Sequence, residues 1–486
     1  MNTETKVCQN CKIEFVIEPE DFNFYEKIKV PPPTFCPRCR FQRRLAFFSL
    51  NSLYKRKCDL CGEEKISMYS PEAPYKVYCP PCWWSDKWDP LEYGRGYDFS
   101  KPFFRQFNEL LHEVPTIGLS VDHPTLVESP YNNHAGHLKN CYLIFQADFN
   151  QDSAYGIYLK KNRAVFDCSI AMLSELCYDC MNLFRSNRCV GGLGNLTESL
   201  DCAFLRDSDN CQSCFVSANL RNKKYYIFNE PYGKEKYLET IKQWDLGSYR
   251  AYQGAKSLAR KHWEKFPPRP VYDDFSTNST GSYVFESKNS KECYDVEGAE
   301  NSKYLFMLSL PPLRDSYDIS SWGNGILLSY ECSVIGENVS GMRFCSEAGI
   351  NAYDLEYCRV CFGGSNQFGC VGMKKGEYCI FNKKYPKEEF DALRGKIISH
   401  MNEMPYTDAK GNIYRYGEFF PIELSPFAYN ETLAQNFFPL SEEEAKLKNY
   451  SWPGLEHRTY AITKKAVELP DHIKDVGDDI SKHVIG

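Results

Sequence analysis

Eight cysteines, from Cys8 to Cys82, form four C-x-x-C pairs, and thiolates at this spacing are typical zinc ligands. Two intervening residues let both sulfurs of a tight turn reach one tetrahedral Zn²⁺, and two such turns complete a closed structural site. A four-cysteine zinc site usually has a spacer of about 15 to 20 residues. The spacer between the last two pairs, 62–78, falls in this range, and the spacer between the first two, 12–35, is somewhat longer. The sequence predicts two zinc ions, with these ligands: Cys8, Cys11, Cys36, Cys39, Cys58, Cys61, Cys79 and Cys82.

A redox role is the alternative interpretation of a C-x-x-C pair. Redox chemistry predicts a single pair beside a βαβ pattern, whereas this chain has four pairs in series. Zinc is therefore favoured. The spacing leaves open whether the four pairs combine sequentially or in a cross-braced order.

The composition is that of a chain without a membrane-spanning helix. The mean hydropathy is −0.50, and no apolar run approaches the length of about 18 residues that a membrane helix needs. The first residues, MNTETKVCQNCK, lack the apolar core of a secretory signal. We expect a cytoplasmic protein with no membrane partner, in which the 23 cysteines stay reduced.

A basic segment lies between the two predicted zinc modules, in a chain whose overall net charge is −6. Arginines beside aromatic residues suit phosphate contact and base stacking, so nucleic acid or a nucleoprotein is the first partner to consider. An acidic protein partner is a second hypothesis. In a third, the segment is a solvated helix that packs its apolar stripe on the ribbons. The seven positive residues are Arg38, Arg40, Arg43, Arg44, Lys55, Arg56 and Lys57.

The first module shows a resemblance in the stretch CQNCKIEFVIEPEDFNFYEKIKVPPPTFCPRCRFQRR. A cysteine knuckle is followed by Phe15, by Phe24 with Tyr25, by a run of three prolines and by a second knuckle with an arginine-rich end. This order resembles the probable zinc-ribbon family of bacterial proteins, and the resemblance implies zinc binding. Near the carboxyl end lies the proline- and aromatic-rich stretch YTDAKGNIYRYGEFFPIELSPFAYNETLAQNFFPLSEEEAKLKNYSWPG. This stretch and the whole architecture resemble a group of bacterial multidomain proteins that carry zinc ribbons at their ends.

From about residue 140 the chain consists of short β-prone segments between polar turns. Cysteines recur along it, and nearly equal intervals separate Cys168, Cys189 and Cys211. Such a period is typical of a solenoid, in which each coil buries its inward face against its neighbours. A leucine-rich repeat would need regular leucines, but those positions hold Cys, Tyr and Phe. We predict a mainly β fold with a right-handed parallel β-helix.

The solenoid region is duplicated. YYIFNEPYGKEKY, which begins at Tyr225, aligns with YCIFNKKYPKEEF, which begins at Tyr378. A helical stretch follows each copy and could cap its open edge. The predicted organisation is zinc-ribbon modules at 1–50 and 51–100, a helical connector at 101–137, solenoid units with helical caps at 138–266 and 283–404, a linker at 267–282, and a small irregular domain at 405–486.

The cysteines of the solenoids have two possible uses. Three pairs have knuckle spacing and could bind additional metal, whereas a column of buried, reduced cysteines that pack as small apolar residues explains the same pattern without metal. We favour the column. The pairs are Cys177 with Cys180, Cys211 with Cys214, and Cys358 with Cys361.

These patterns favour a zinc-binding interaction protein without a catalytic signature. Its zinc-ribbon region would contact nucleic acid or a nucleoprotein, and the solenoid would serve as a scaffold or binding surface. One alternative is an enzyme that acts on a polysaccharide or nucleic acid in the solenoid groove. A structural or assembly protein is another.

Overall fold

The described part of the chain, residues 3–308, 310–453 and 460–486 of a computed structural model, forms two compact units. The unit that we call the ribbon unit comprises Met1–Ser120 and Val271–Pro453, and the capped unit comprises Val121–Pro270 and Gly454–Gly486. The predicted carboxyl-terminal region 405–486 is therefore divided between the two. Among the described residues, no helix has both the length and the apolar character needed to cross a membrane.

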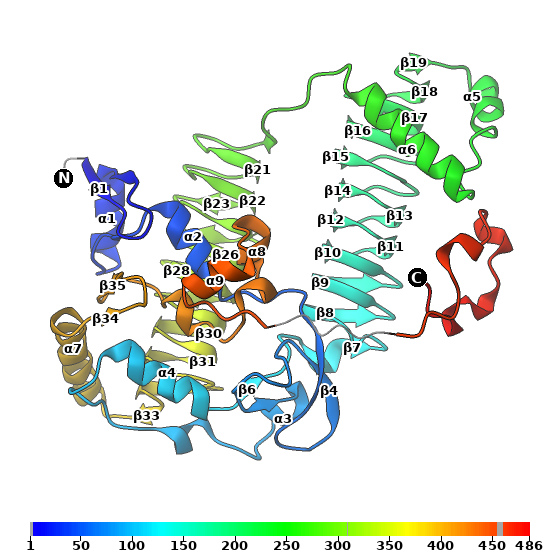
Figure 1. Ribbon diagram of the computed structural model, residues 1–486. Coiled ribbons are helices and arrows are strands. Elements are labelled where there is room, and N and C mark those ends of the chain that lie inside the picture. The colour runs from blue at the N-terminus through cyan, green and yellow to red at the C-terminus, as the bar shows by residue number, and fades with distance from the viewer. Residues whose placement is uncertain (1–2, 309, 454–459) are drawn as a thin grey trace. The chain divides into compact units, whose positions relative to one another are not determined.

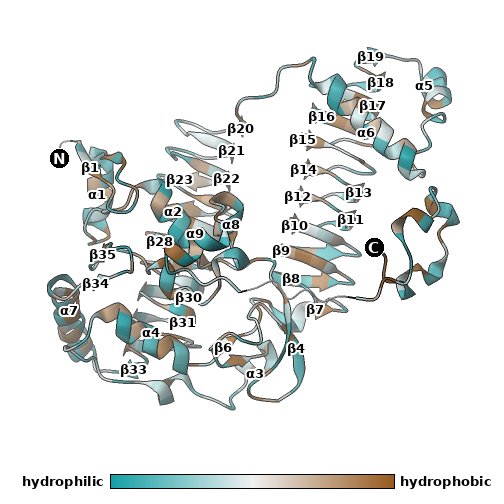
Figure 2. Cartoon of the chain, viewed as in Figure 1, coloured by the Kyte–Doolittle hydropathy of each residue, from teal (hydrophilic) through white to brown (hydrophobic). Residues whose placement is uncertain are grey.

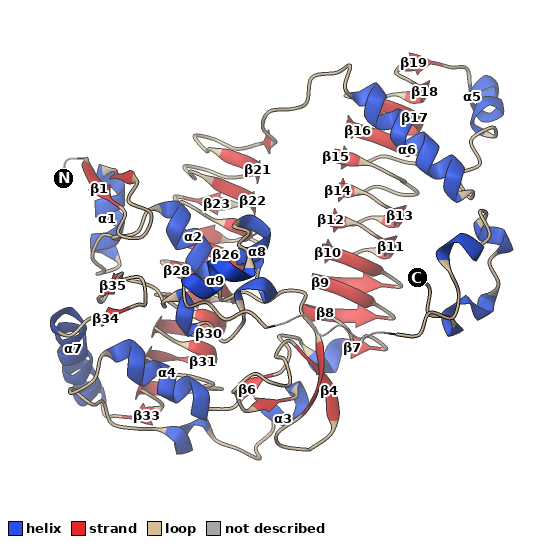
Figure 3. Cartoon of the chain, viewed as in Figure 1, coloured by secondary structure: helices blue, strands red, loops and turns tan. Residues whose placement is uncertain are grey.

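A parallel β-solenoid in each unit confirms the predicted fold class, and the stacked rungs are visible in Figures 1 and 3. Strands pair in parallel throughout, except that the last strand of each solenoid turns back antiparallel. The first solenoid consists of β7 (Leu126–Val127), β8 (Asn133–Lys139), β9 (Tyr142–Gln151), β10 (Ala154–Lys160), β11 (Arg163–Phe166), β12 (Ser169–Met172), β13 (Glu175–Tyr178), β14 (Met181–Phe184), β15 (Leu193–Thr197), β16 (Ala203–Asp209), β17 (Gln212–Ala218), β18 (Lys224–Ile227) and β19 (Glu230–Pro231).

The second solenoid lies in the ribbon unit and has the same construction. Its strands are β20 (Asp273–Asp274), β21 (Gly281–Phe285), β22 (Cys293–Glu297), β23 (Ala299–Glu300), β24 (Phe306–Leu308), β25 (Leu313–Arg314), β26 (Tyr317–Gly323), β27 (Ile326–Leu327), β28 (Tyr330–Gly336), β29 (Val339–Ser340), β30 (Ser346–Glu356), β31 (Arg359–Phe368), β32 (Glu377–Ile380) and β33 (Lys383–Lys384).

Each coil is shorter than the cysteine spacing predicted. Ala154 pairs with Tyr142 on one side and with Phe166 on the other, so equivalent positions of neighbouring rungs differ by 12 in the numbering. In the second solenoid Tyr317 pairs with Tyr330, a step of 13. The intervals between Cys168, Cys189 and Cys211 are therefore not the period of the coil. They connect cysteines that occupy different inward positions of nearby coils.

The short coil is possible because the chain turns a corner at every third residue. From His134 to Arg188, each third residue has a positive φ. A coil of the first solenoid thus has four sides of three residues each. The residue after each corner points inward and is buried, as Cys141, Ile144 and Ala147 are. Small inward side chains suit this narrow interior, and the rungs contain both hydrophilic and hydrophobic residues (Figure 2).

Residues at equivalent positions of successive coils form columns that fill the interior. Cys177, Cys189, Cys202 and Cys214 occupy successive rungs of the first solenoid and are all buried. In the second solenoid Cys332, Cys345, Cys358 and Cys370 do the same. Polar columns are held by hydrogen bonds instead: Asn150 Oδ1 accepts the backbone N–H of Asn162 at 3.1 Å, and Asn162 Oδ1 accepts that of Ser174 at 2.9 Å. Each inward amide thus satisfies a buried backbone group of the next coil.

Helices follow each solenoid, as the sequence predicts. After the first come α5 (Lys234–Ile241) and α6 (Tyr249–Trp263). The buried side of α6 contacts Phe204 and Phe215 of β16 and β17, and the indole of Trp263 donates to Ser217 O at 3.1 Å. After the second solenoid comes α7 (Lys387–Glu403), which buries Phe390 and Ile397.

The remaining α-helices and β-strands belong to the ribbon unit. A single α-helix, α4, lies in the expected helical connector, which also contains short strands and the start of the first solenoid. The elements are β1 (Glu4–Val7), β2 (Glu14–Ile17), α1 (Pro19–Lys27), α2 (Pro37–Leu45), β3 (Tyr54–Lys57), β4 (Glu64–Ser67), β5 (Val77–Tyr78), α3 (Pro80–Trp83), α4 (Phe103–Glu113), β6 (Thr116–Ile117), β34 (Tyr406–Thr407), β35 (Ile413–Tyr414), α8 (Leu433–Phe437) and α9 (Glu442–Leu447).

Candidate metal centres

The first four cysteines converge on one point. The sulfur atoms of Cys8, Cys11, Cys36 and Cys39 all lie within 4.8 Å of one another. Cys11 Sγ and Cys36 Sγ are 3.7 Å apart. Four thiolates around a tetrahedral zinc, with Zn–S distances of about 2.3 Å, have sulfurs separated by roughly 3.8 Å. The donor set and its spacing therefore fit one zinc ion.

The second four cysteines, Cys58, Cys61, Cys79 and Cys82, form an equivalent group within the same 4.8 Å limit. The backbone N–H of Cys79 donates to Cys58 Sγ at 3.2 Å. Burial raises the pKa of Cys58, but the backbone N–H groups of Cys61, Cys79 and Leu60 outweigh it and lower that pKa to about 7. Both groups combine consecutive pairs, so the ligand order is sequential and not cross-braced.

Local structure explains how each pair is presented. The first pair of each module lies at a hairpin turn, β1–β2 or β3–β4, where Lys12 or Gly62 has the positive φ that a tight turn needs. The second pair starts a helix, with Cys36 before Pro37 of α2 and Cys79 before Pro80 of α3. Proline is favoured in the first helical turn because its missing N–H costs no hydrogen bond there.

Among the described residues, these two groups are the only sets of three or more possible ligands that come together. Cys177 and Cys180 occupy consecutive inward positions of one coil, as do Cys211 with Cys214 and Cys358 with Cys361, and each belongs to a packing column. The knuckle spacing of three thus follows from the three-residue sides. The packing interpretation of these cysteines agrees with the structure.

The basic segment has a different environment from the one expected for nucleic-acid contacts. Arg40, Arg43 and Arg44 lie on α2 and are fully buried, with at most 1 % of their surface exposed. Arg40 Nη2 is 2.8 Å from Asp318 Oδ2, and Arg44 Nη1 is 2.8 Å from Asp318 Oδ1. Their guanidinium groups are used inside the protein and do not reach the surface.

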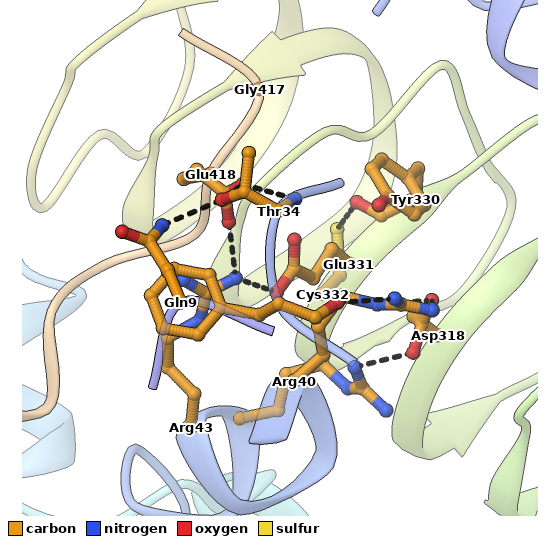
Figure 4. Close-up of polar contacts among 12 residues, drawn as sticks. Gln9, Thr34, Arg40, Arg43, Asp318, Tyr330, Glu331, Cys332, Gly417 and Glu418 are labelled. Atoms are coloured by element: carbon orange, nitrogen blue, oxygen red, sulfur yellow. Dashed lines mark hydrogen bonds and ion pairs between the residues drawn. The ribbon is translucent and has the colours of Figure 1, made fainter. Parts of the chain in front are cut away.

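Arg43 completes a neutral cluster of three arginines and three carboxylates, and Figure 4 labels all of its members except Arg44. Arg43 pairs with Glu331 and, at 2.9 Å, with Glu418 Oε2, while its guanidinium lies 4.2 Å from the ring centre of Phe35. Glu418 Oε1 also accepts the backbone N–H of Thr34 at 2.8 Å. Burial raises the pKa of Glu331 although Arg43 opposes the shift. We call these six residues the arginine cluster: Arg40, Arg43, Arg44, Asp318, Glu331 and Glu418.

The other four predicted basic residues lie nearer the surface. Arg38, Lys55 and Lys57 are exposed. Arg56 is partly buried because it donates to Ser70 O at 2.8 Å and to Tyr75 O at 2.7 Å in the loop before β5. Of the aromatic neighbours that could have stacked on bases, Phe47 and Phe48 are buried. Of the seven predicted basic residues, Arg38, Lys55 and Lys57 are therefore the ones exposed to a possible polyanion.

The sequence did not predict the carboxylates of the arginine cluster. Asp318 and Glu331 are corner residues of neighbouring coils, with φ of 58° and 47°. A carboxylate at a corner is ordinary in a turn, and nothing nearby in the sequence marks these two. The available signal was the coil step of 13 in this solenoid, which places them one above the other.

The second predicted zinc module packs against the same solenoid. Arg359 of β31, itself buried, donates to Tyr69 Oη at 2.9 Å and lies 3.2 Å from Glu347 Oε2. Lys374 Nζ lies 4.5 Å from the ring centre of Trp88 and donates to Ser85 O at 2.5 Å. Both modules are thus integral parts of the ribbon unit.

Comparisons with known proteins add no functional argument. No family model matches this chain, and no curated protein matches it. A solved structure from Desulfovibrio desulfuricans G20, of a protein proposed to be an acetyltransferase, matches with 10% identity over 59% of this chain and 86% of that one. Its TM-score is 0.12, too low to relate the two folds.

Proposed function

We propose that this chain is a non-enzymatic scaffold protein in which two structural zinc ions fold the ribbons and fix them on the second solenoid. The observation that carries the proposal is the arginine cluster, because it joins α2, which begins at the zinc ligand Cys36, to two coils of the solenoid. Since the energy of structural zinc binding is also folding energy, each metal stabilises its module and the docked interface together. The exposed sides of the solenoids supply the binding surface.

Metal analysis and thermal unfolding test this proposal. Purified protein should contain two zinc ions per chain, and Cys36→Ser and Cys79→Ser should each lose one. Chelation should lower the transition temperature of the ribbon unit and leave that of the capped unit unchanged. A chain that contains no zinc, or one whose unfolding is unaffected by chelation, would contradict the proposal.

Nucleic-acid contact by the exposed basic residues is a second candidate function. It is favoured by the exposure of Arg38, Lys55 and Lys57 in one segment of the ribbon unit. Replacing these three residues by alanine should weaken DNA or RNA binding and reduce its salt dependence. A triple variant with unchanged affinity and salt slope would exclude this role for the ribbons.

A further inference from the structure

The two solenoids correspond coil by coil. In both, the last parallel strand ends at an isoleucine that pairs with an antiparallel strand, Ile227 with Glu230 and Ile380 with Lys383. Going back from that end, Phe215 corresponds to Phe368 one coil before. Tyr178 corresponds to Tyr330, and Phe166 to Tyr317, on the fourth and fifth coils. The sequence duplication therefore extends to equivalent outward positions.

In the second solenoid these positions receive the first zinc ribbon. Phe24 of α1 stacks on Tyr317 with ring centres 3.9 Å apart, and Tyr25 meets the ring of Tyr330 at 5.4 Å. The corner residues that follow, Asp318 and Glu331, bind the arginines of α2. We call this side of the second solenoid the docked face: Tyr317, Asp318, Tyr330 and Glu331.

The first solenoid presents the same chemistry in the same positions, with Phe166, Asp167 and Tyr178 exposed and Asp179 partly buried. We call it the open face: Phe166, Asp167, Tyr178 and Asp179. Phe166 is 40% exposed and Tyr178 is 44% exposed, whereas Tyr317 and Tyr330 are 6% and 0% exposed. Asp167 and Asp179 have the positive φ of corner residues, as Asp318 and Glu331 have. Each carboxylate thus follows an aromatic residue in both solenoids.

Helix α6 of the capped unit contacts part of the open face. Lys256 and the hydroxyl of Tyr252, both on α6, contact Asp179, much as Arg43 contacts Glu331. Tyr252 also meets Tyr178, with ring centres 5.7 Å apart. The apolar contacts of α6 then continue away from these coils, toward Phe204 and Phe215. α6 therefore stops at the edge of the open face.

Asp167 is the position that α6 leaves available. Its counterpart Asp318 holds two guanidinium groups, those of Arg40 and Arg44. The side chain of Asp167 is mostly exposed; its partial burial and the neighbouring carboxylate of Asp179 raise its pKa, although the charge of Lys256 on α6 opposes the shift. A further cation beside this carboxylate would favour its charged form. Two exposed tyrosines, Tyr142 and Tyr155, extend the aromatic surface over the preceding coils, with ring centres 5.7 Å apart.

We propose that the open face is a docking site for the arginine-bearing helix of a zinc-ribbon segment supplied by another protein. The proposal rests on the scaffold function above and names its partner class. The partner presents two arginines at i, i+4 spacing, as Arg40 and Arg44 do, for Asp167, and an aromatic ring for Phe166, as Phe24 does for Tyr317. Carboxylates and aromatic rings on the receptor complement guanidinium groups by ion pairing and by stacking.

The probe for a test is the ribbon of this chain, because the docked face shows what it binds. A synthetic segment of residues 3–50, loaded with one zinc and labelled, is titrated with the zinc-loaded full-length chain while fluorescence anisotropy is recorded. Saturable binding is expected, and Asp167→Asn or Phe166→Ala should weaken it at least about tenfold, the range of one lost charged or aromatic contact. Raising the salt concentration should weaken it further.

Matched controls make the result specific. Asp201→Asn replaces an exposed corner carboxylate that pairs with Arg188 on another side of the same solenoid, and it should leave binding unchanged. A probe with Arg40→Gln and Arg44→Gln should fail to bind. A stapled helical peptide of Pro37–Ala46, with Cys39→Ser, serves as a second probe that needs no metal.

Three outcomes would overturn the proposal. One is the absence of binding by both probes, and another is binding that Asp167→Asn and Asp201→Asn weaken equally. The third is dimerisation of the full-length chain that Asp167→Asn abolishes in sedimentation measurements, because a second copy would then be the occupant. None of these outcomes affects the zinc content or the response to chelation, so the scaffold proposal is tested separately.

Discussion

Arg40 and Asp318, which lie far apart in the sequence, form a buried ion pair in which Nε and Nη2 of the arginine both donate to Oδ2, at 3.0 and 2.8 Å. The same carboxylate accepts from Arg44 through Oδ1. One corner carboxylate of the solenoid thus binds two arginines of α2, the helix that begins after the candidate metal ligand Cys36. This relationship links the candidate metal centre to the contact between the ribbon and the solenoid.

Removal of one residue from the arginine cluster should destabilise the ribbon unit. We expect Arg40→Ala to destabilise the ribbon unit by about 3 to 5 kcal/mol, because it leaves the buried carboxylate of Asp318 with fewer cationic partners. Arg38→Ala, two positions earlier on the same helix but exposed, should change stability by less than about 0.5 kcal/mol. Urea unfolding of both variants measures the difference. Equal effects would show that the cluster does not hold the ribbon.

The interior asparagine column should be equally sensitive to truncation. Asn162→Ala removes the acceptor of the Ser174 N–H and the donor to Ala171 O, both buried. Each unsatisfied group costs about 1 to 3 kcal/mol. Asn210→Ala, which removes an exposed corner contact to Asn222 at 2.7 Å, is the matched control and should have a small effect. Similar shifts of the transition temperature for the two variants would contradict a stabilising role of the asparagine column.

The cysteine columns can be tested for packing against metal binding. Cys345 lies between Cys332 and Cys358 in the second solenoid. Cys345→Leu should lower stability by about 1 to 3 kcal/mol, because the larger, branched side chain overfills a closely packed interior. Its zinc content should stay at the wild-type value, whereas Cys61→Ser should lose an ion. Loss of metal from the Cys345 variant would assign the column a ligand role.

The cap helix α6 should make stability depend on pH. Burial, with Lys265 nearby, lowers the pKa of His262, whose Nε2 lies 3.0 Å from Asn229 Oδ1. The unfolded chain therefore binds a proton at this histidine more readily than the folded chain does. Above a pH of about 6.5 the histidine is neutral in both states and does not affect folding; as the pH falls below this value, its protonation in the unfolded chain lowers the free energy of unfolding. His262→Gln should reduce the loss of thermal stability between pH 7.5 and 5.5. An unchanged loss would rule out this histidine as its source.

The sequence was sufficient to find the two groups of cysteines that could hold a metal and to predict the fold class, because both depend on local spacing. Cys58 and Cys61 indicate a knuckle by themselves, and short segments between turns indicate a solenoid. The coil period was missed because cysteine fills only some inward positions, while Ser, Asn, Gly and Ala fill the others. The burial of Arg43 could not be foreseen because its partners, Glu331 and Glu418, come from distant coils and loops.

Hydrogen exchange on metal removal tests most directly the claim that zinc holds the ribbon on the solenoid. When zinc is chelated from the full-length chain, we predict faster amide exchange in α2 and in β26 and β28, which carry Asp318 and Glu331. Exchange in β11 to β14 of the first solenoid, which has no zinc ligand, should not change. Unaltered protection of β26 and β28 after complete zinc removal would contradict the account.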